Sequence, residues 1–369
     1  MRKILFCVCF LLVCCVVYAQ HTGKYKVNGK IEGMESGQVV MKQKTAEGYN
    51  ELGVSDIKNG QFEFKGKIAE IQSVQLFFNN QRGSLTLFLE PGKIHVAVKK
   101  DSIYYGNVEG TSTNELWQYF NKEERRLESV EAGCAQAYQK AFATKDKEIV
   151  RAATRAFVDA TKARKIFRNE FLNHSAHKYV AACFYRTSLM QKLQYAELDS
   201  LVKSYVGMEN NNDVRLITQR RDLMRTVAVG ARVPEINLPD VEGKFFALSS
   251  FRGKWVLLDF WASWCAPCRE ETVYIKDIYN KFHDAGLEVF SVSLDDKKAA
   301  WLKAIEEDGM IWNHGCQLLK GGKNTPVAQL YGIDGIPAIW VIDPEGKILA
   351  QGLKGEELVA FCTGLFQNK

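Results

Sequence analysis

The sequence predicts an α/β domain at the C-terminal end of the chain, preceded by a small all-β domain and an α-helical segment. Short apolar runs alternate with amphipathic stretches after about residue 230, an alternating and turn-rich pattern precedes residue 110, and apolar residues recur at helical spacing between the two. A chain of 369 residues is also too long for one compact domain. We therefore expect four parts: a leader at 1–19, a β domain at 20–110, a helical segment at 111–229 and an α/β domain at 230–369.

The composition is that of an ordinary soluble globular protein, with 46% hydrophobic and 25% charged residues. The formal net charge of +6 is too small to indicate binding to nucleic acid. We therefore expect no nucleic-acid partner.

The first residues have the pattern of a signal peptide. A basic start at Arg2 and Lys3 precedes an apolar run and an A-x-A-like end at Ala19, so we expect cleavage after residue 19 and export. Cys14 raises the alternative of a lipoprotein anchor, but Val13 stands where a small residue normally precedes a lipidated cysteine. We therefore expect a cleaved leader in preference to a lipid anchor.

The segment 20–110 alternates apolar and polar residues between turns such as Asn59-Gly60 and Pro91-Gly92. This pattern predicts a small antiparallel β domain, either a sandwich or an open barrel. It contains no group of acids, histidines or glycines that would suggest catalysis. The predicted strands are 25–31, 39–41, 62–64, 74–78, 85–89 and 94–98.

The segment 111–229 changes to a helical period. Ser112 and Glu115 have the spacing of a capping box, which predicts a helix beginning at Ser112. We expect this segment to serve as a spacer, a surface for a homodimer or a clamp over the active site. The further predicted helices are 146–172, 176–193, 197–206 and 213–229.

In the α/β domain, a buried strand at 256–261 leads directly into a helix that begins at Cys265. The amides of a first helical turn lack intrahelical partners and carry partial positive charge, which favours a thiolate over a thiol. Cysteines at such positions can have pKa values lowered from about 8.5 to roughly 3.5 to 7.5. Pro267 suits the first turn, and Cys268 lies one turn further along the same face, within reach of a disulfide. The other predicted elements are a hairpin at 236–248, strands at 287–294, 338–342 and 348–351, and helices at 297–307, 327–331 and from 355.

The ten residues from Asp259 to Cys268, Asp-Phe-Trp-Ala-Ser-Trp-Cys-Ala-Pro-Cys, resemble the active-site signature of the thioredoxin superfamily. They are most similar to the TlpA/ResA-like thiol-disulfide oxidoreductases of bacterial envelopes. The resemblance implies a thioredoxin fold for 230–369, a periplasmic location and dithiol/disulfide exchange. The run Phe88–Lys93 resembles an N-terminal domain of unknown function that precedes redox domains in envelope proteins of Bacteroides-like bacteria.

The position of each residue, together with this resemblance, predicts the reactive groups. Cys265, closer to the free helix amides, is the expected nucleophile, and Cys268 is the expected resolving cysteine. Asp259 lies inside an apolar strand, where burial raises a carboxyl pKa, and it matches the buried acid of thioredoxins that accepts the proton of the second cysteine. Glu271 matches a glutamate of the ResA-like branch that lies near the dithiol.

Substrate-binding residues are expected around the dithiol. Pro337 precedes a strand and is a candidate cis-proline, and in thioredoxin-like proteins the preceding residue, here Ile336, offers its backbone to the bound chain. Trp264 and Pro267 are expected at the exposed rim. Ala338 stands where this family usually has threonine, a departure that we expect to alter selectivity and not fold.

The expected function is exchange of disulfides for thiols in envelope proteins. The resemblance to the TlpA/ResA-like group implies the reducing direction, with electrons from a membrane donor. We expect no flavin, nicotinamide or metal cofactor. A zinc site made of Cys265, Cys268, His314 and Cys316 is an alternative, but a helix-start pair combined with a His-x-Cys loop is not a usual zinc spacing.

Two other functions remain open from the sequence. Peroxidases share the expected fold, but they present Pro and Thr or Ser ahead of the reactive cysteine, whereas Ala262 stands three residues before Cys265. The other is a binding or scaffold protein, in which the β and helical parts recognise an envelope partner and the dithiol is secondary. Cys316 could act as a third thiol, and the sequence does not decide whether Cys134 and Cys183 are bridged or free.

Overall fold

The computed structural model describes residues 22–79 and 81–367, so the leader predicted at 1–19 lies outside the described residues. The described chain divides into two compact units. The first runs to Met190 and includes Val202–Ile217, and the second comprises Gln191–Leu201 and the chain from Thr218 onwards. The helical segment expected at 111–229 is therefore shared between the two units. None of the helices among the described residues combines the length and apolar character needed to cross a membrane.

The N-terminal β domain is one eight-stranded sheet with the order β6-β5-β2-β3-β4-β1-β7-β8. Side chains from strands at both ends of the sheet, such as Leu87 and Val108, belong to the same apolar core. The sheet therefore curves around a single core, as an open barrel does, instead of forming two packed sheets. Its strands are β1 (Gly23–Glu32), β2 (Ser36–Lys44), β3 (Tyr49–Lys58), β4 (Gln61–Ile68), β5 (Gln72–Phe78), β6 (Leu85–Leu89), β7 (Gly92–Lys99) and β8 (Asn107–Glu109).

Two details of this sheet differ from the sequence prediction. The expected antiparallel arrangement is wrong for β1 and β7, which pair in parallel, because the alternation of side chains specifies the buried face and not the strand direction. Strand β3 and the short β8 were not predicted. In β3, Leu52 and Val54 are exposed and only Ile57 is buried, so this strand lacks the alternation that marks a half-buried strand.

The first long helix, α2 (Ser112–Thr144), does not begin with the predicted capping box. Thr111 is the N-cap residue and its side chain makes no cap hydrogen bond. The carboxylate of Glu90, which is buried beside the helix start, accepts hydrogen bonds from the amides of Thr113 (2.9 Å) and Asn114 (3.3 Å). An acid from a distant part of the chain thus satisfies the free amides and complements the helix dipole.

Asn114 also joins this helix to the edge of the sheet. Its side-chain amide donates to the carbonyl of Phe88 at 2.8 Å and its side-chain oxygen accepts from the amide of Phe88 at 2.8 Å. These two bonds satisfy Phe88 on the edge strand β6 as a neighbouring strand would. Phe88 then packs edge-on against Trp117 in a second apolar core, which the helices share with the β domain.

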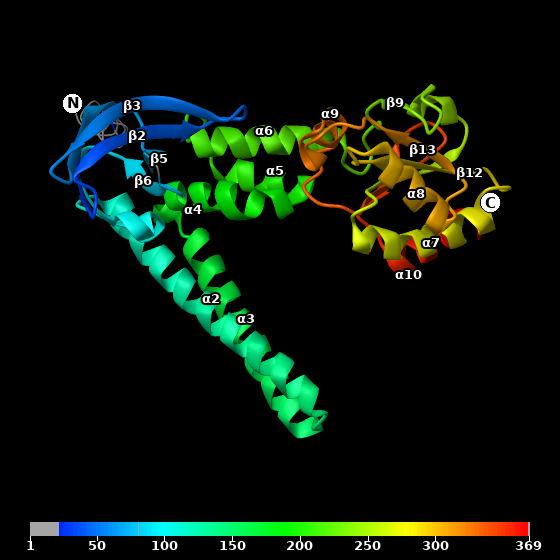
Figure 1. Cartoon of the computed structure of the whole chain (residues 1–369), viewed down its shortest axis with the longest axis horizontal. Helices are drawn as coiled ribbons and strands as arrows, with labels where there is room; N and C mark the ends of the chain where they lie inside the picture. The colour runs from blue at the N-terminus through cyan, green and yellow to red at the C-terminus, as the bar shows by residue number, and fades with distance from the viewer. Residues whose placement is uncertain (1–21, 80, 368–369) are drawn as a thin grey trace, which may run out of the picture. The chain divides into compact units, whose positions relative to one another are not determined.

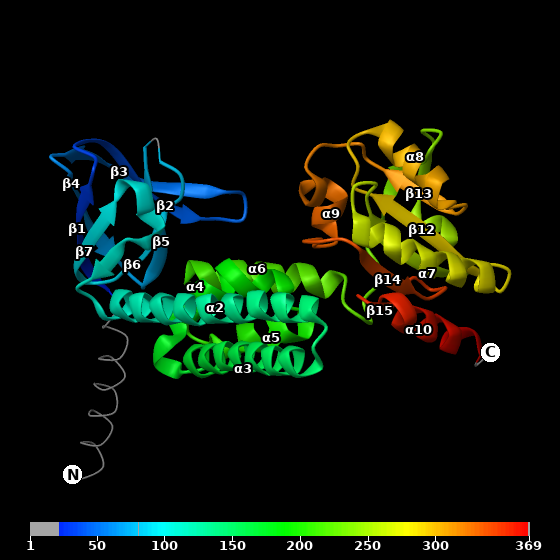
Figure 2. The same cartoon turned by 60° about the horizontal axis from the view of Figure 1, so that its bottom comes forward.

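Helix α2 and helix α3 (Lys147–Leu172) form a long antiparallel hairpin in the first unit, where they lie side by side in both views (Figures 1 and 2). Glu124, which is buried, pairs with Arg164 and Arg168 on α3. The predicted helix at 176–193 is interrupted, because α4 ends at Phe184 and a π-helical turn, Tyr185–Leu189, follows. The remaining helices of this segment are α4 (Lys178–Phe184), α5 (Tyr195–Ser204) and α6 (Asn212–Thr226).

The C-terminal domain has the predicted thioredoxin fold, a five-stranded mixed sheet with the order β13-β12-β11-β14-β15. Alternate residues of the central strand β11 face opposite sides: Leu257 packs with α7, α8 and α10, whereas Phe260 packs with Tyr331 and Trp340. Helices α7 and α10 pack together against the sheet (Figure 2). The elements are β9 (Asn237–Pro239), β10 (Phe245–Ala247), β11 (Trp255–Trp261), α7 (Ala266–Phe282), β12 (Leu287–Ser293), α8 (Lys298–Asp308), β13 (Asn313–Cys316), α9 (Pro326–Leu330), β14 (Ala338–Ile342), β15 (Ile348–Gln351) and α10 (Gly355–Gln367).

The contact of Asn114 with the edge strand gives a test of stability. Replacing Asn114 with alanine leaves the buried amide and carbonyl of Phe88 without these partners, so we expect the free energy of unfolding to fall by about 1–3 kcal/mol. Urea denaturation followed by circular dichroism measures this change. The half-buried Asn121 on the same helix supplies a control, Asn121→Ala, which should cost less. Equal losses for the two variants would contradict the assigned role of Asn114.

Candidate active site

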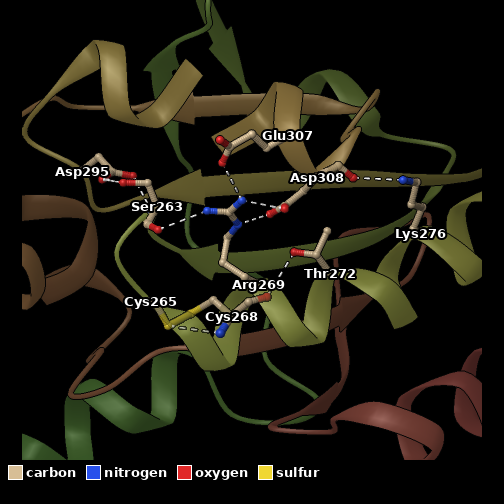
Figure 3. Close-up of polar contacts among 9 residues, drawn as sticks. All are labelled: Ser263, Cys265, Cys268, Arg269, Thr272, Lys276, Asp295, Glu307 and Asp308. Atoms are coloured by element: carbon tan, nitrogen blue, oxygen red, sulfur yellow. Dashed lines mark hydrogen bonds and ion pairs between the residues drawn. A yellow bond between two sulfur atoms is a disulfide. The ribbon is translucent and has the colours of Figure 1, made fainter. Parts of the chain in front are cut away.

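The site is built where β11 ends and α7 begins. Cys265 is the N-cap residue of α7, and the amide of Cys268 donates to its Sγ at 3.2 Å. The two sulfurs form a disulfide with an S–S distance of 2.08 Å (Figure 3). The first-turn amide of Cys268, which also donates to the carbonyl of Cys265 at 3.0 Å, points at the sulfur of Cys265 and favours negative charge there when the bond is reduced.

The surroundings of the dithiol are apolar on one side and open on the other. Both cysteines are buried, Cys265 with 6% and Cys268 with 2% of its surface exposed. Trp264 is 63% exposed and Pro267 is also exposed, so these residues form the outer rim. Trp261, by contrast, is packed in the core under the helix.

The loop before β14 reaches the dithiol from the neighbouring strand. The bond between Ile336 and Pro337 is cis, and the carbonyl oxygen of Ile336 lies 3.7 Å from Sγ of Cys265. Ala338 pairs with Phe260 in the antiparallel ladder between β14 and β11, which brings this loop to the end of β11 that carries the dithiol. The structure therefore places Ile336 against Cys265, where the sequence analysis expected it.

Asp259 is buried on the face of β11 that α7 covers. It lies two residues from both Leu257 and Trp261, which pack in the same core as Cys268, and it is 4% exposed. Burial raises the pKa of Asp259 to about 7; a hydrogen bond from Ser291 opposes the shift and the nearby charge of Glu271 adds to it. This carboxyl group can therefore change its protonation state near neutral pH.

Two residues that the sequence analysis did not single out control the hydrogen bonding of Asp259. The hydroxyl of Ser291, opposite Asp259 on β12, donates to the Asp259 carboxylate at 3.1 Å. The indole N–H of Trp312 donates to Ser291 Oγ at 2.9 Å. Because the indole can only donate, the hydroxyl hydrogen of Ser291 is directed towards the carboxylate. The sequence signal that could have revealed Ser291 is its position as a polar residue in the middle of a mostly apolar strand.

Glu271 lies on the next turn of α7 and is buried. Its Oε1 accepts a 2.6 Å hydrogen bond from the amide of Gly355, the first residue of α10. Glu271 is therefore engaged with the start of another helix, and it influences the dithiol region through its charge near Asp259.

Side chains that come just before and just after the dithiol in the chain hold its loop and helix in place (Figure 3). Asp295 accepts from the amide (2.9 Å) and the hydroxyl (2.6 Å) of Ser263, which ties the loop before Cys265 to the end of β12. Arg269 pairs with Asp308 and with Glu307 (3.2 Å), which ties the start of α7 to the end of α8. These contacts join residues far apart in the chain, so sequence spacing did not reveal them.

The other two groups of the zinc alternative come from the strand next to β12. His314 and Cys316 lie on β13, a strand that was predicted as a loop, and both are buried. The ring of His314 stacks near Trp312, and burial lowers its pKa to about 4. In residues 22–79 and 81–367, no group of three or more His, Cys, Asp or Glu side chains is arranged to hold a metal ion. Within the same ranges, Cys134, Cys183, Cys316 and Cys362 are free thiols.

Family models match both the β domain and the C-terminal domain. Residues 229–351 match the model of the AhpC/TSA family, and residues 25–117 match a domain of unknown function (DUF4369). The crystal structure of the thioredoxin domain of a thiol-disulfide oxidoreductase from Bacteroides vulgatus is 40% identical, covers 38% of this chain and 98% of its own, and has a TM-score of 0.36. A thiol-disulfide oxidoreductase from Bacteroides fragilis is 31% identical, covers 36% of this chain and 98% of its own, and has a TM-score of 0.34.

Two curated relatives are also thiol-disulfide oxidoreductases. The thiol-disulfide oxidoreductase ResA of Geobacillus thermodenitrificans is 32% identical over 122 residues, which is 33% of this chain and 67% of the relative. ResA of Bacillus thuringiensis subsp. konkukian is 31% identical over 129 residues, which is 35% of this chain and 71% of the relative. With this identity and coverage, and with a dithiol at the start of α7 in a thioredoxin fold, the chain belongs to the ResA-like thiol-disulfide oxidoreductases of the thioredoxin superfamily.

Proposed function

We propose that the chain is an exported oxidoreductase that reduces disulfides in envelope proteins through Cys265 and Cys268, with electrons from a membrane donor. The observation that carries this proposal is the position of Cys265 Sγ, which accepts the amide of Cys268 at 3.2 Å and lies 3.7 Å from the carbonyl of Ile336. One contact favours a thiolate, and the other places it beside backbone that can pair with an extended client chain.

In the first step, the Cys265 thiolate attacks one sulfur of the client disulfide. A mixed disulfide forms between Cys265 and that sulfur, and the other client sulfur leaves as a thiolate that takes a proton from water. In the second step, the thiol of Cys268 gives its proton to the carboxylate of Asp259 and attacks Sγ of Cys265. The bond to the client breaks, and the second client sulfur leaves as a thiolate that takes a proton from water, so the client leaves with two thiols. The Cys265–Cys268 disulfide holds the oxidised state, and Asp259 releases the proton it accepted to solvent. The membrane donor then returns two electrons, and one proton from water restores the Cys268 thiol beside the Cys265 thiolate.

Asp259 can accept this proton because burial raises the pKa of its carboxyl group to about 7. An ordinary carboxylate is too weakly basic to take a proton from a thiol, whereas the pKa of about 7 for Asp259 is much closer to that of a cysteine. Ser291, oriented by Trp312, donates to the same carboxylate and keeps part of the population ionised.

The mechanism predicts that a Cys268→Ser variant stops after the first step. Mixed disulfides with client proteins should accumulate on Cys265 and disappear on treatment with dithiothreitol, as seen on non-reducing gels. A Cys265→Ser/Cys268→Ser variant, which retains the free thiols of Cys134 and Cys316, is the matched control and should trap nothing. If the control traps as many proteins, or if peroxide consumption and not disulfide reduction depends on Cys265, the proposed reaction is wrong.

The second step is expected to accelerate as pH rises. Asp259 accepts a proton only when ionised, and its pKa is about 7, so the rate of client release should rise through pH 7 and level off above it. Asp259→Asn should remove this rise and lower the rate at pH 8. Stopped-flow measurement of release from a preformed mixed disulfide isolates this step. An unchanged pH profile in the variant would exclude Asp259 as the acceptor.

Replacing Ser291 should move the same profile. Ser291→Ala removes the hydrogen bond that lowers the pKa of Asp259, so the midpoint should shift upwards by about one pH unit. Ser291→Thr keeps the hydroxyl and is expected to keep the wild-type midpoint. A midpoint that falls in Ser291→Ala, or that moves equally in both variants, would contradict the assigned direction of this hydrogen bond.

A further inference from the structure

A cavity of about 300 Å³ opens beside the cis-proline. One wall consists of Pro337 and Ala338, the residues that follow the contact between Ile336 and Cys265. The opposite wall comes from outside the thioredoxin fold and includes Gln191 and Arg220. Both walls belong to the second compact unit, so the end of the helical segment is part of the same body as the dithiol.

Arg220, in the C-terminal part of α6, holds the loop that leads to the cis-proline. Its Nη2 donates to the carbonyl of Gly332 at 3.0 Å and to Oδ2 of Asp334 at 2.7 Å. Only 9% of the Arg220 side chain is exposed, and burial lowers its pKa although Asp334 opposes the shift. A buried guanidinium that bonds to both backbone and carboxylate is costly to move, so these contacts fix the loop strongly.

Gly332 fits closely against this guanidinium. Its φ of +62° favours glycine, and a Cβ atom at this position would lie 2.8 Å from Nη1 of Arg220 and 3.0 Å from Sδ of Met224. Two further hydrogen bonds tie the end of the helical segment to the sheet. Trp340 donates to the carbonyl of Val227 at 3.1 Å, and Gln351 donates to the side chain of Gln194 at 2.7 Å. The wall of the cavity that comes from the helical segment is thus held by hydrogen bonds both to the loop and to the sheet.

The position of the cavity indicates what it can bind. A client chain that pairs with the backbone of Ile336 continues past Pro337, and extended chain advances about 3.3 Å per residue. Client residues that follow Pro337 and Ala338 along this path meet the cavity that these two residues line. Its volume suits a few residues of polypeptide, and a small disulfide that reacts at Cys265 has no chain to place there.

We propose that the client-binding site extends past the cis-proline into this cavity, that it receives the polypeptide segment flanking the client's cysteine, and that Arg220 is a positioning residue for the loop. This inference rests on the proposed exchange reaction but adds a site for the chain of the client. It assigns the end of the helical segment a role in selecting polypeptide substrates.

The test compares two substrates of the reduced full-length protein: insulin, a polypeptide disulfide, and dithiodipyridine, a small disulfide. Arg220→Met should lower kcat/KM for insulin about tenfold, mainly through KM, because a misplaced loop weakens productive binding. The rate with dithiodipyridine should fall much less, and Arg220→Lys should recover part of the loss with insulin. Arg221→Met is the matched control, since Arg221 lies next to Arg220 on α6 but pairs with Asp199 and Asp222.

A second variant tests the cavity without touching the loop contacts. Gln191→Trp, on the exposed wall, should fill part of the cavity and raise KM for insulin alone. If Arg220→Met and Gln191→Trp leave insulin reduction unchanged, or if Arg220→Met lowers both substrates equally, the proposed site is wrong. Failure of the wild-type protein to reduce either substrate would instead overturn the proposed function.

Discussion

The hydrogen bond from the amide of Cys268 to the sulfur of Cys265 is the interaction on which the site depends. It exists only because β11 delivers the chain to the first turn of α7 at Cys265. That delivery in turn requires β11 to be buried in the centre of the sheet, between β12 and β14. The positions of the sheet and the helix together therefore decide that a first-turn amide of α7 meets the sulfur of Cys265.

The same sheet places an acid under the helix. A buried carboxylic acid is unfavourable when charged, and the protein compensates with one hydrogen bond from Ser291 instead of a paired cation. The result is a group whose charge is easily changed, which suits a proton acceptor better than a permanent ion pair would. Around it, the contacts of Asp295 with Ser263 and of Arg269 with Asp308 hold the loop and helix, so the sulfur and the acid keep their relative positions.

Within each compact unit, parts outside the thioredoxin fold are held by side chains that connect residues far apart in the sequence. Glu90 and Asn114 connect the β domain to the start of α2, and Arg220 connects the end of α6 to the loop before the cis-proline. In each case a polar side chain satisfies backbone groups that secondary structure leaves unpaired. The helical segment is consequently shared between two compact units and is not an independent domain.

By itself, the sequence determined the fold class, the dithiol and most of the elements, because these depend on local patterns. Apolar periodicity marks β11 and α7, and the spacing of Cys265 and Cys268 matches one helical turn. Only the tertiary structure decided the parallel pairing of β1 with β7, the strand that carries His314, the replacement of the Ser112 cap by Glu90, and the partners of Asp259 and Arg220. Those features join residues far apart in the chain, and side-chain periodicity carries no information about which distant groups will meet.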